Sequence, residues 1–365
     1  MRIAHISDTH LGYRQLQLDE RENDLYEAFK QAVDVAIEER VDVLIHSGDL
    51  FDSPTPPIKA LYVLKGVLRK INAKMKFYCV LGDHDIPKRR GMPPHKLFDL
   101  RVLGTAGLEW DEVDGVLIAG ISNMRGRMVE FLRQEIKKFD PIAEKYRNSI
   151  LVAHQAIEKY LPFEGDYELK EDELPRNANY YAFGHIHARQ ITRFGKGFLA
   201  YSGATEILKR DEISSWRRDG KGIFIVDIEG DEPEVQKVDL DIRPQFDIEL
   251  ECENLEKEIL NLDFSRKPLL YLDIKGKKMD TGQIYEKLQN LLKDRVLYFK
   301  PSFIDTSKPV PELPRGLIRI EELLRAYLKD ERLTNLAIEL LGPLSKGEIE
   351  TAKDIASKYL EDVGI

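Results

Sequence analysis

The chain has 365 residues, of which 42% are hydrophobic and 33% are charged, and its formal net charge is −9 at pH 7. Because single cores stop growing at about 250–300 residues, this length predicts one large domain with smaller additions. The acidic balance excludes a global basic field, so any binding of nucleic acid must be local. Cys79 and Cys252 lack C-x-x-C spacing, which excludes a disulfide framework and a thiolate zinc site.

The start of the sequence and its apolar runs predict neither export nor membrane insertion. A strand pattern begins at Ile3, directly after Arg2, and leaves no room for a signal peptide. No apolar stretch of about 20 residues could span a membrane. Cys79 lies in the apolar run Phe77–Leu81 and is predicted to be a buried small hydrophobe. We therefore expect a protein of the reducing cytoplasm.

Three basic clusters interrupt the acidic sequence, and each by itself is interpreted as a solvated face. They are Lys88 with Arg89 and Arg90, Arg217 with Arg218 and Lys221, and Lys275 with Lys277 and Lys278. Local binding of a nucleic acid would have to use clusters of this kind.

Residues 1 to about 240 alternate short apolar runs with helical stretches, which is typical of an α/β or mixed sandwich architecture. Five strand-like runs lead directly into a polar segment that contains Asp or His. These runs are Ile3–Ser7, Val41–Ser47, Phe77–Leu81, Ile150–Ala153 and Tyr180–Phe183. In α/β sheets ligands collect at the carboxyl ends of strands. The five ends are therefore predicted to converge on one site.

The predicted helix Pro57–Ile71 is apolar on nearly all sides. One stripe is predicted to be core and consists of Leu64, Val67, Leu68 and Ile71. Leu61 and Tyr62 begin a second stripe. This second stripe is interpreted either as a deeper core or, with Leu97 and Leu100 of the next predicted helix, as an interface.

After Asp241 the pattern predicts a small α+β module. Phe246–Glu251 alternates like a strand, Pro268–Ile274 and Val296–Ile304 look like strands, and Thr281–Leu292 looks helical. Prolines at 309, 311 and 314 then predict an extended linker.

Beyond the linker, apolar residues recur at helical spacing in two segments, and Ser345 with Glu348 predicts the capping box of a third helix. The spacing is carried first by Ile320, Leu323, Leu324, Tyr327 and Leu328, and then by Leu333, Leu336, Ala337, Leu340, Leu341 and Leu344. About fifty residues of amphipathic helix make a small core at best. We therefore expect these helices to bind a partner.

The polar segments after the five runs have the composition of a metal site. They are Asp8-Thr9-His10, Gly48-Asp49, Gly82-Asp83-His84-Asp85, His154 and Gly184-His185-Ile186-His187. Carboxylate oxygens and imidazole nitrogens suit Mn, Fe or Zn, and residues two apart in an extended segment point to the same side. A single His near a strand end is more often a core residue than a ligand. Five such segments reverse that expectation and predict a dinuclear metal site.

Three further histidines are interpreted as structural. His5 and His46 lie inside predicted strands, where local polar groups would satisfy them. His95 follows Pro94 in a basic segment and is predicted to be solvated at the start of a helix.

The order D-x-H, G-D, G-[N/D]-H-[E/D], H and G-H-x-H resembles the calcineurin-like metallophosphoesterase superfamily. More narrowly, the segments 8–13, 48–52, 154–155 and 181–187 resemble the archaeal meiotic-recombination-eleven nucleases, whose bacterial relative is SbcD. The resemblance covers essentially the full chain. It implies an α/β fold, a sandwich of two mixed β-sheets flanked by helices, with a small α+β capping domain and a C-terminal helical module.

The resemblance also implies the roles of the site residues. One metal would be held by Asp8, His10, Asp49 and His187, and the other by Asp49, Asp83, His154 and His185. The two ions are expected to be Mn²⁺, with Asp49 bridging them. His84 would face the phosphate as a protonated donor, and Asp85 would orient its ring.

Two positions depart from the common family pattern. Asp83 stands where most members carry Asn, which lowers the net charge of two divalent ions and their carboxylates from about +2 to about +1. Asp52 stands where some relatives place His. The extra carboxylate is expected to tighten metal binding and to weaken the attraction of phosphate.

The resemblance further implies four parts: a nuclease domain at 1–240, a DNA-capping domain at 241–305, a Pro-rich linker at 306–316 and an ATPase-binding helical module at 317–365. The expected function is a manganese-dependent exonuclease and endonuclease that acts on single- and double-stranded DNA ends in double-strand-break repair. The expected partners are a coiled-coil ABC-type ATPase of the radiation-sensitivity-fifty family and a second copy, bound through helices near 57–71 and 95–103. The expected location is the cytoplasm, at the nucleoid.

Two other functions compete with this one. An enzyme for small phosphodiesters or nucleotides would need neither the appended helices nor an ATPase, so a neighbouring gene for a large coiled-coil ATPase with a Walker A motif would decide against it. A non-catalytic DNA-tethering scaffold would tolerate the loss of ligands, but every expected ligand position holds a competent residue.

Overall fold

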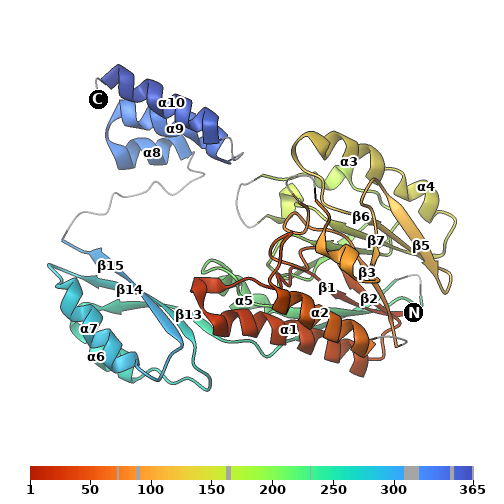
Figure 1. Ribbon diagram of the computed structural model, residues 1–365, viewed down its shortest axis with the longest axis horizontal. Helices are drawn as coiled ribbons and strands as arrows, with labels where there is room; N and C mark the ends of the chain where they lie inside the picture. The colour runs from red at the N-terminus through yellow and green to blue at the C-terminus, as the bar shows by residue number, and fades with distance from the viewer. Residues whose placement is uncertain are drawn as a thin grey trace. The chain divides into compact units, whose positions relative to one another are not determined.

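The computed structural model describes residues 1–71, 74–87, 91–161, 166–230, 232–307, 320–345 and 349–363 (Figure 1). The chain divides into two compact units. The first contains residues 1–248, 259–272 and 289–301, and the second contains residues 249–258, 273–288 and 302–365. All the candidate site residues belong to the first unit.

The first unit contains two six-stranded mixed sheets. One has the order β12-β11-β1-β2-β3-β4 and is parallel from β1 to β4, with β11 and β12 added antiparallel. Its strands are β1 (Arg2–Ile6), β2 (Val43–His46), β3 (Lys76–Cys79), β4 (Arg101–Val102), β11 (Gly222–Asp227) and β12 (Glu234–Asp239). The register pairs Ala4 with Leu44 and Leu44 with Phe77.

The other sheet has the order β5-β6-β7-β8-β10-β9. Strands β6, β7, β8 and β10 run parallel, and β5 and β9 close the two edges antiparallel. The strands are β5 (Glu109–Val113), β6 (Val116–Ile121), β7 (Asn148–His154), β8 (Tyr180–Gly184), β9 (Gln190–Phe194) and β10 (Gly197–Tyr201). Parallel strands β1 to β3 and β6 to β8 place several carboxyl ends at one edge of each sheet.

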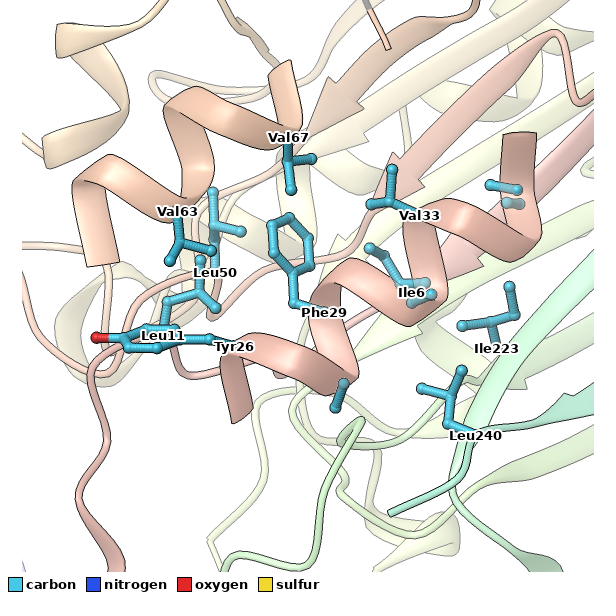
Figure 2. Close-up of a cluster of buried hydrophobic side chains, with 14 of the residues drawn as sticks. Ile6, Leu11, Tyr26, Phe29, Val33, Leu50, Val63, Val67, Ile223 and Leu240 are labelled. Atoms are coloured by element: carbon cyan, nitrogen blue, oxygen red, sulfur yellow. The ribbon is translucent and has the colours of Figure 1, made fainter. Parts of the chain in front are cut away.

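Three apolar cores hold the layers together. Alternation along β1 sends Ile3 into the core between the two sheets and Ile6 into the core under the helices. The helix-side core of the first sheet involves α1 (Asp19–Glu38), α2 (Ile58–Ile71) and α5 (Glu212–Asp219). Figure 2 shows Phe29 of α1 and Val67 of α2 in this cluster. The second sheet is covered by α3 (Val129–Ile136) and α4 (Phe139–Ala143).

The second unit and the strands that lead into it contain the predicted α+β module. A three-stranded sheet has the order β13-β14-β15, and its strands contribute residues to both units. The elements are β13 (Gln245–Glu251), α6 (Leu255–Leu260), β14 (Leu269–Gly276), α7 (Thr281–Leu292) and β15 (Tyr298–Asp305). The helix predicted for Thr281–Leu292 is confirmed over those same residues.

Three C-terminal helices follow: α8 (Ile320–Leu328), α9 (Glu331–Ser345) and α10 (Ile349–Val363). Helix α9 contacts both α8 and α10. The prolines of the predicted linker, Glu348 of the predicted capping box and the basic cluster at 88–90 lie outside the described residues. Within the described ranges, no helix combines the length and the apolar character needed to cross a membrane.

The fold class expected from the sequence is confirmed, because two mixed sheets are flanked by helices. The five strand-like runs correspond to β1, β2, β3, β7 and β8. One element was predicted wrongly. Residues 95–103 were expected to be helical but contain only the end of a short 3₁₀ turn, Pro94–Leu97, and the two-residue strand β4. Pro93 precedes this turn in an extended conformation, and Phe98 ends it in the same way.

Candidate metal centre

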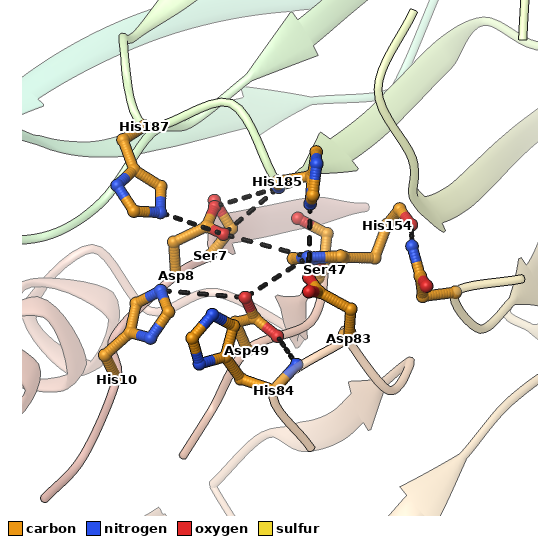
Figure 3. Close-up of polar contacts among 12 residues, drawn as sticks. Ser7, Asp8, His10, Ser47, Asp49, Asp83, His84, His154, His185 and His187 are labelled. Atoms are coloured by element: carbon orange, nitrogen blue, oxygen red, sulfur yellow. Dashed lines mark hydrogen bonds and ion pairs between the residues drawn. The ribbon is translucent and has the colours of Figure 1, made fainter. Parts of the chain in front are cut away.

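Side chains from five strand ends meet at one point, as the sequence predicted. Asp8 and His10 follow β1, Asp49 follows β2 and Asp83 follows β3, all in the first sheet. His154 ends β7, and His185 and His187 follow β8 in the second sheet. Figure 3 shows these side chains pointing toward one another. The centre therefore lies where the carboxyl ends of both sheets come together.

The backbone around the centre is held in conformations that most residues avoid. Asp8, His10, Asp49 and His185 have φ values of 49°, 43°, 54° and 93°. Left-handed conformations in residues other than glycine are uncommon and cluster at functional sites. A Cβ at Gly82 would lie 2.0 Å from Oδ1 of Asp49, so only glycine permits this approach. These strained backbone conformations direct the side chains toward the centre.

The side chains form overlapping groups with the chemistry of a two-metal site. Within each group, one candidate ligand atom per residue lies within 4.8 Å of the others. The groups are Asp8 with His10 and His187, Asp83 with His154 and His185, Asp8 with Asp49 and His154, and His10 with Asp49 and His84. Asp49 is shared between groups, which is the placement that a bridging carboxylate needs.

Hydrogen bonds on the outer ring nitrogens fix which nitrogen faces the centre. Nδ1 of His154 lies 2.7 Å from the carbonyl oxygen of Ser47, and because a carbonyl only accepts, Nδ1 must carry the proton. Nδ1 of His187 lies 2.8 Å from Oε1 of Glu212 and is held in the same way. In both rings Nε2 is left to face the carboxylates, as in metal-binding histidines.

Several inward-facing nitrogens are buried without a hydrogen bond. Considering only the residues that the structure describes, both ring nitrogens of His10 and Nε2 of His154 have no hydrogen-bond partner. Nε2 of His154 lies 3.4 Å from Oδ2 of Asp49, and Nε2 of His10 lies 3.6 Å from the same atom. These distances exceed the usual 2.7–3.2 Å of an N–H···O bond. Buried polar groups without partners are rare and point to a missing ion.

The charge of the centre also favours cations. Burial on its own would lower the pKa of His10, but the carboxylates around it, Asp52 first, raise the pKa to about 9. Burial likewise opposes protonation of His154, yet the neighbouring carboxylates, led by Asp49, raise its pKa well above the ordinary value. Divalent cations would balance the same carboxylates. Oxygen and imidazole donors with a surplus of negative charge thus fit divalent metal ions.

His84 belongs to one of these groups, with His10 and Asp49, and is exposed to the cleft. Its Nδ1 donates to the carbonyl oxygen of Asp52 at 2.8 Å, and its backbone N–H donates to Oδ1 of Asp49 at 2.9 Å. Asp85 is fully buried and accepts from the backbone amides of Leu50, Phe51 and Gly82. The expectation that Asp85 orients the ring of His84 is therefore wrong. The ring is held by Asp52, and Asp85 holds the loops that carry Asp49 and Asp83.

The other histidines are structural. His5 bonds to Tyr180 and Ser47, and His46 bonds to Thr9, as predicted. His95 is buried rather than solvated, because the turn Pro94–Leu97 packs it against Phe51. Burial lowers the pKa of His95.

Sequence reasoning missed three residues around the centre. Glu212 contacts His187, and Lys221 pairs with Glu212 at 2.7 Å. Lys221 was assigned to a solvated face but is almost fully buried. Arg125 donates from Nη1 to Oδ2 of Asp83 at 2.9 Å. These contacts join residues 9 to 42 positions apart, and no local sequence pattern marks them.

A cleft of about 890 Å³ opens at the centre. Asp49, Asp83, His84, His185 and His187 line one part of it. Lys159, Lys209, Arg218 and Lys237 are among the residues that line the rest. Asp211, Glu212 and Asp219 also line the cleft, so a polyanion there would meet cationic and acidic side chains together.

A two-sheet sandwich with carboxylates and imidazoles at its strand ends defines a metal-dependent phosphoesterase. Residues 1–189 match the family model for calcineurin-like phosphoesterases. Over most of its length the chain is similar to archaeal proteins named DNA double-strand break repair protein Mre11. It is 38% identical to the protein from Thermoplasma acidophilum, with 95% of both chains covered, and 35% identical to that from Methanocaldococcus jannaschii, with 98% of both covered. It is 33% identical to the protein from Saccharolobus solfataricus, with 96% of both covered.

The chain therefore belongs to the Mre11 family of DNA double-strand break repair proteins. Membership confirms the enzyme class expected from the sequence, a metal-dependent nuclease. It does not favour the alternative of an enzyme for small phosphodiesters.

Proposed function

We propose that this chain is the manganese-dependent nuclease subunit of a double-strand-break repair complex and that it hydrolyses phosphodiester bonds at DNA ends. One observation carries the proposal. Carboxylates and imidazoles from both sheets converge with their inward ring nitrogens lacking hydrogen-bond partners among the described residues, as in His10 and His154. Such a set is complete only with cations.

The groups suggest how the ligands divide between two ions. Asp8, His10 and His187 would form the first site, and Asp83, His154 and His185 the second, with Asp49 shared by both. When bound, two divalent ions supply the positive charge that the transferring phosphate needs and increase the acidity of water. Mn²⁺ is the ion expected from the resemblance to the archaeal nucleases, and carboxylate ligands suit it.

The chain's own residues position the substrate and move a proton. Lys159, Lys209, Arg218 and Lys237 would bind the phosphates of a strand that lies in the cleft. With Nδ1 of His84 donating to Asp52, its Nε2 is free to donate a proton or hydrogen bond to the leaving oxygen. Asp85 would act indirectly by fixing the amides of Leu50, Phe51 and Gly82.

The four parts of the chain would have separate roles. Residues 1–240 would be the nuclease domain, 241–305 the DNA-capping domain and 306–316 the linker. Ile58 and Tyr62 on α2 are exposed, and so is Leu97 in the turn Pro94–Leu97. These exposed apolar side chains support a homodimer that uses α2 and this turn. Exposed Ile320 and Tyr327 on α8 support binding of a coiled-coil ABC-type ATPase by 317–365. The assembly would act on single- and double-stranded ends at the nucleoid.

The nuclease assignment is tested with purified protein, linear duplex or single-stranded DNA, and Mn²⁺ in chelator-treated buffer. Asp49→Ala should reduce cleavage by roughly a thousandfold or more, because it removes a carboxylate that lies with His10 in one group and with His154 in another. Asp111→Ala, which removes an exposed partner of Arg101, is the control and should cleave like the parent. Undiminished cleavage by Asp49→Ala would falsify the two-metal assignment.

The partner assignment has its own test. A chain that ends at Asp305 should cleave single strands but should no longer copurify with the ATPase. Copurification at full strength would place the ATPase interface on the nuclease domain instead.

A further inference from the structure

We infer that the two metal sites are unequal, with a tightly held ion at Asp8, His10 and His187 and a weakly held, exchangeable ion at Asp83, His154 and His185. The inference rests on the ligand division proposed above. It comes from side chains behind the ligands, which act in opposite directions on the two sites.

The first site is reinforced by a buried carboxylate. Oε1 of Glu212 accepts a hydrogen bond from Nδ1 of His187 at 2.8 Å. Oε2 accepts from Nζ of Lys221 at 2.7 Å, and the same ammonium donates to the carbonyl oxygen of His187 at 2.8 Å. Lys221 thus fixes Glu212, and Glu212 fixes the ring. A carboxylate behind a ligating histidine makes it a better donor, and its loss typically costs about 10- to 100-fold in metal affinity.

The second site is weakened by a guanidinium. Nη1 of Arg125 lies 2.9 Å from Oδ2 of Asp83, while Oδ1 of the same carboxylate lies 3.3 Å from Nδ1 of His185 and 3.5 Å from Nε2 of His154. Asp83 therefore turns one oxygen to the centre and one to Arg125. The guanidinium acts through this carboxylate, because it offsets part of the negative charge that the ligand offers to a cation. Asp83 consequently attracts a cation less than an unpaired carboxylate would.

The two sites also differ in their contact with water. At the second site the side chains of Asp83 and His185 are 13% and 29% exposed and that of His154 is 0% exposed, whereas at the first site those of Asp8 and His10 are 0% and 3% exposed. At the first site only His187, at 18%, reaches solvent. The second site is thus easier to enter and leave.

A functional consequence follows from this asymmetry. At limiting Mn²⁺ the protein would hold one ion, and the second site would fill when a DNA phosphate brings additional negative charge into the cleft. Arg125 is 53% exposed and can turn to that phosphate, which would release Asp83 to the metal. Cleavage would then follow the free Mn²⁺ concentration rather than the total protein-bound metal.

Calorimetric titration of the metal-free, full-length protein with MnCl₂ tests the inference without relying on activity. The parent should bind two ions in two steps whose dissociation constants differ at least tenfold. Arg125→Gln should tighten the weaker step about tenfold and leave the tighter step unchanged. In an Asp83→Asn background the same change should have no effect on either step, because the carboxylate through which Arg125 acts is gone.

Glu212→Gln should weaken the tighter step by about 10- to 100-fold and leave the weaker one unchanged. It also leaves Lys221 buried without its partner, so circular dichroism is recorded to confirm that each variant is folded. The double variant Glu212→Gln, Lys221→Met removes that unpaired charge. Its tighter step should stay weakened if Glu212 positions His187. Full recovery of affinity would show that Glu212 only neutralises Lys221 and would overturn this half of the inference.

Other outcomes separate this inference from the proposed function. Two ions bound with equal affinity, or an Arg125→Gln effect that persists with Asn at position 83, would overturn the inequality while leaving the two-metal nuclease intact. Binding of fewer than two ions at saturating MnCl₂ would overturn both.

Discussion

Two clusters of buried charge lie in the first unit, and they differ in how their members are satisfied. One is the metal centre. The other, here called the arginine network, consists of Gln15, Arg21, Asp24, Glu206, Arg243 and Gln245. Both contain carboxylates that are nearly fully removed from water. In the arginine network both carboxylates, Asp24 and Glu206, accept hydrogen bonds from the guanidinium of Arg21.

Arg21 is fully buried at the middle of the arginine network. It donates to Gln15 at 2.7 Å, to Asp24 at 2.7 Å and to Glu206 at 2.8 Å. Arg243 adds a bond of 2.9 Å to the second oxygen of Asp24. Buried charges are tolerated when each has a paired and hydrogen-bonded partner.

The buried polar groups of the metal centre are not all paired in this way. Over the described part of the chain, its carboxylates face imidazoles whose inward nitrogens make no hydrogen bond in His10 and His154. Burial and charge alone therefore do not distinguish a functional site from a structural cluster. Among the described residues, what distinguishes this cluster is donor atoms that converge without satisfying one another, on a backbone strained at Asp8, His10, Asp49 and His185.

Breaking the arginine network should have the largest effect on stability. Arg21→Met removes the guanidinium that pairs with buried Glu206, whereas Asp24 keeps Arg243, so the free energy of unfolding should fall by about 3–5 kcal/mol. Urea denaturation of the metal-free protein measures this. Arg101→Met, which breaks an exposed pair with Asp111, is the control and should cost less than about 1 kcal/mol. Equal losses in the two variants would contradict the contrast drawn here.

His84→Ser tests whether His84 is a metal ligand or a proton donor beside the ligands. The Nδ1 atom of His84 is already engaged by Asp52, and its role is assigned to proton donation. Cleavage should therefore fall by roughly 10²–10⁴-fold while two Mn²⁺ remain bound. Bound metal at equilibrium with saturating free Mn²⁺ and single-turnover cleavage are measured on the same sample. A loss of one ion would instead make His84 a ligand.

Mn²⁺ should stabilise the folded protein by binding at the metal centre. The arginine network should not contribute to this gain. At 100 times the dissociation constant, a ligand that binds only the folded state adds about 2.7 kcal/mol to the free energy of unfolding. Arg21→Met should gain as much from Mn²⁺ as the parent gains, because its metal ligands are untouched. Asp49→Ala should gain little. A similar gain in Asp49→Ala would mean that the ions bind elsewhere.

His5 belongs to neither cluster, and its protonation should make the stability of the protein depend on pH. Burial lowers its pKa from 6.5 to about 3. Above pH 6.5 neither state is protonated, between pH 6.5 and about 3 only the unfolded state binds the proton, and below about 3 both do. Stability should thus fall as pH drops through this window, by up to about 1.4 kcal/mol per pH unit.

The matched variant is His5→Gln, which keeps groups able to bond to Tyr180 and Ser47. Urea denaturation at pH 7 and at pH 4.5 should show a smaller loss for this variant than for the parent. Parallel losses would show that His5 is not the group that responds.

The metal centre could be predicted from the sequence because each ligand follows a strand that local alternation already marks. Asp8, Asp49, Asp83 and His154 stand at or just after the ends of apolar runs, and parallel strands bring such ends together. The arginine network carries no such mark. Arg21 lies within α1, and its partner Glu206 is 185 positions away in a loop.

The same reason explains what was missed at the centre itself. Glu212 meets His187 from the first turn of α5, and Arg125 reaches Asp83 from the loop after β6. The resemblance implied that Asp85 orients His84, whereas the fold turns the carboxylate of Asp85 to backbone amides. Local sequence patterns do not predict contacts that form only through tertiary packing.

The most direct test of the dinuclear centre is the number and coupling of Mn²⁺ ions bound per chain, measured by equilibrium dialysis and electron paramagnetic resonance at a saturating concentration of free Mn²⁺. We expect two ions per chain with the signal of a spin-coupled pair, because Asp49 lies in one group with His10 and in another with His154, a ligand of each proposed site. Asp49→Ala should lose the coupled signal, and Arg21→Met should keep it. Two uncoupled ions in the parent, or one ion at saturation, would contradict a dinuclear centre.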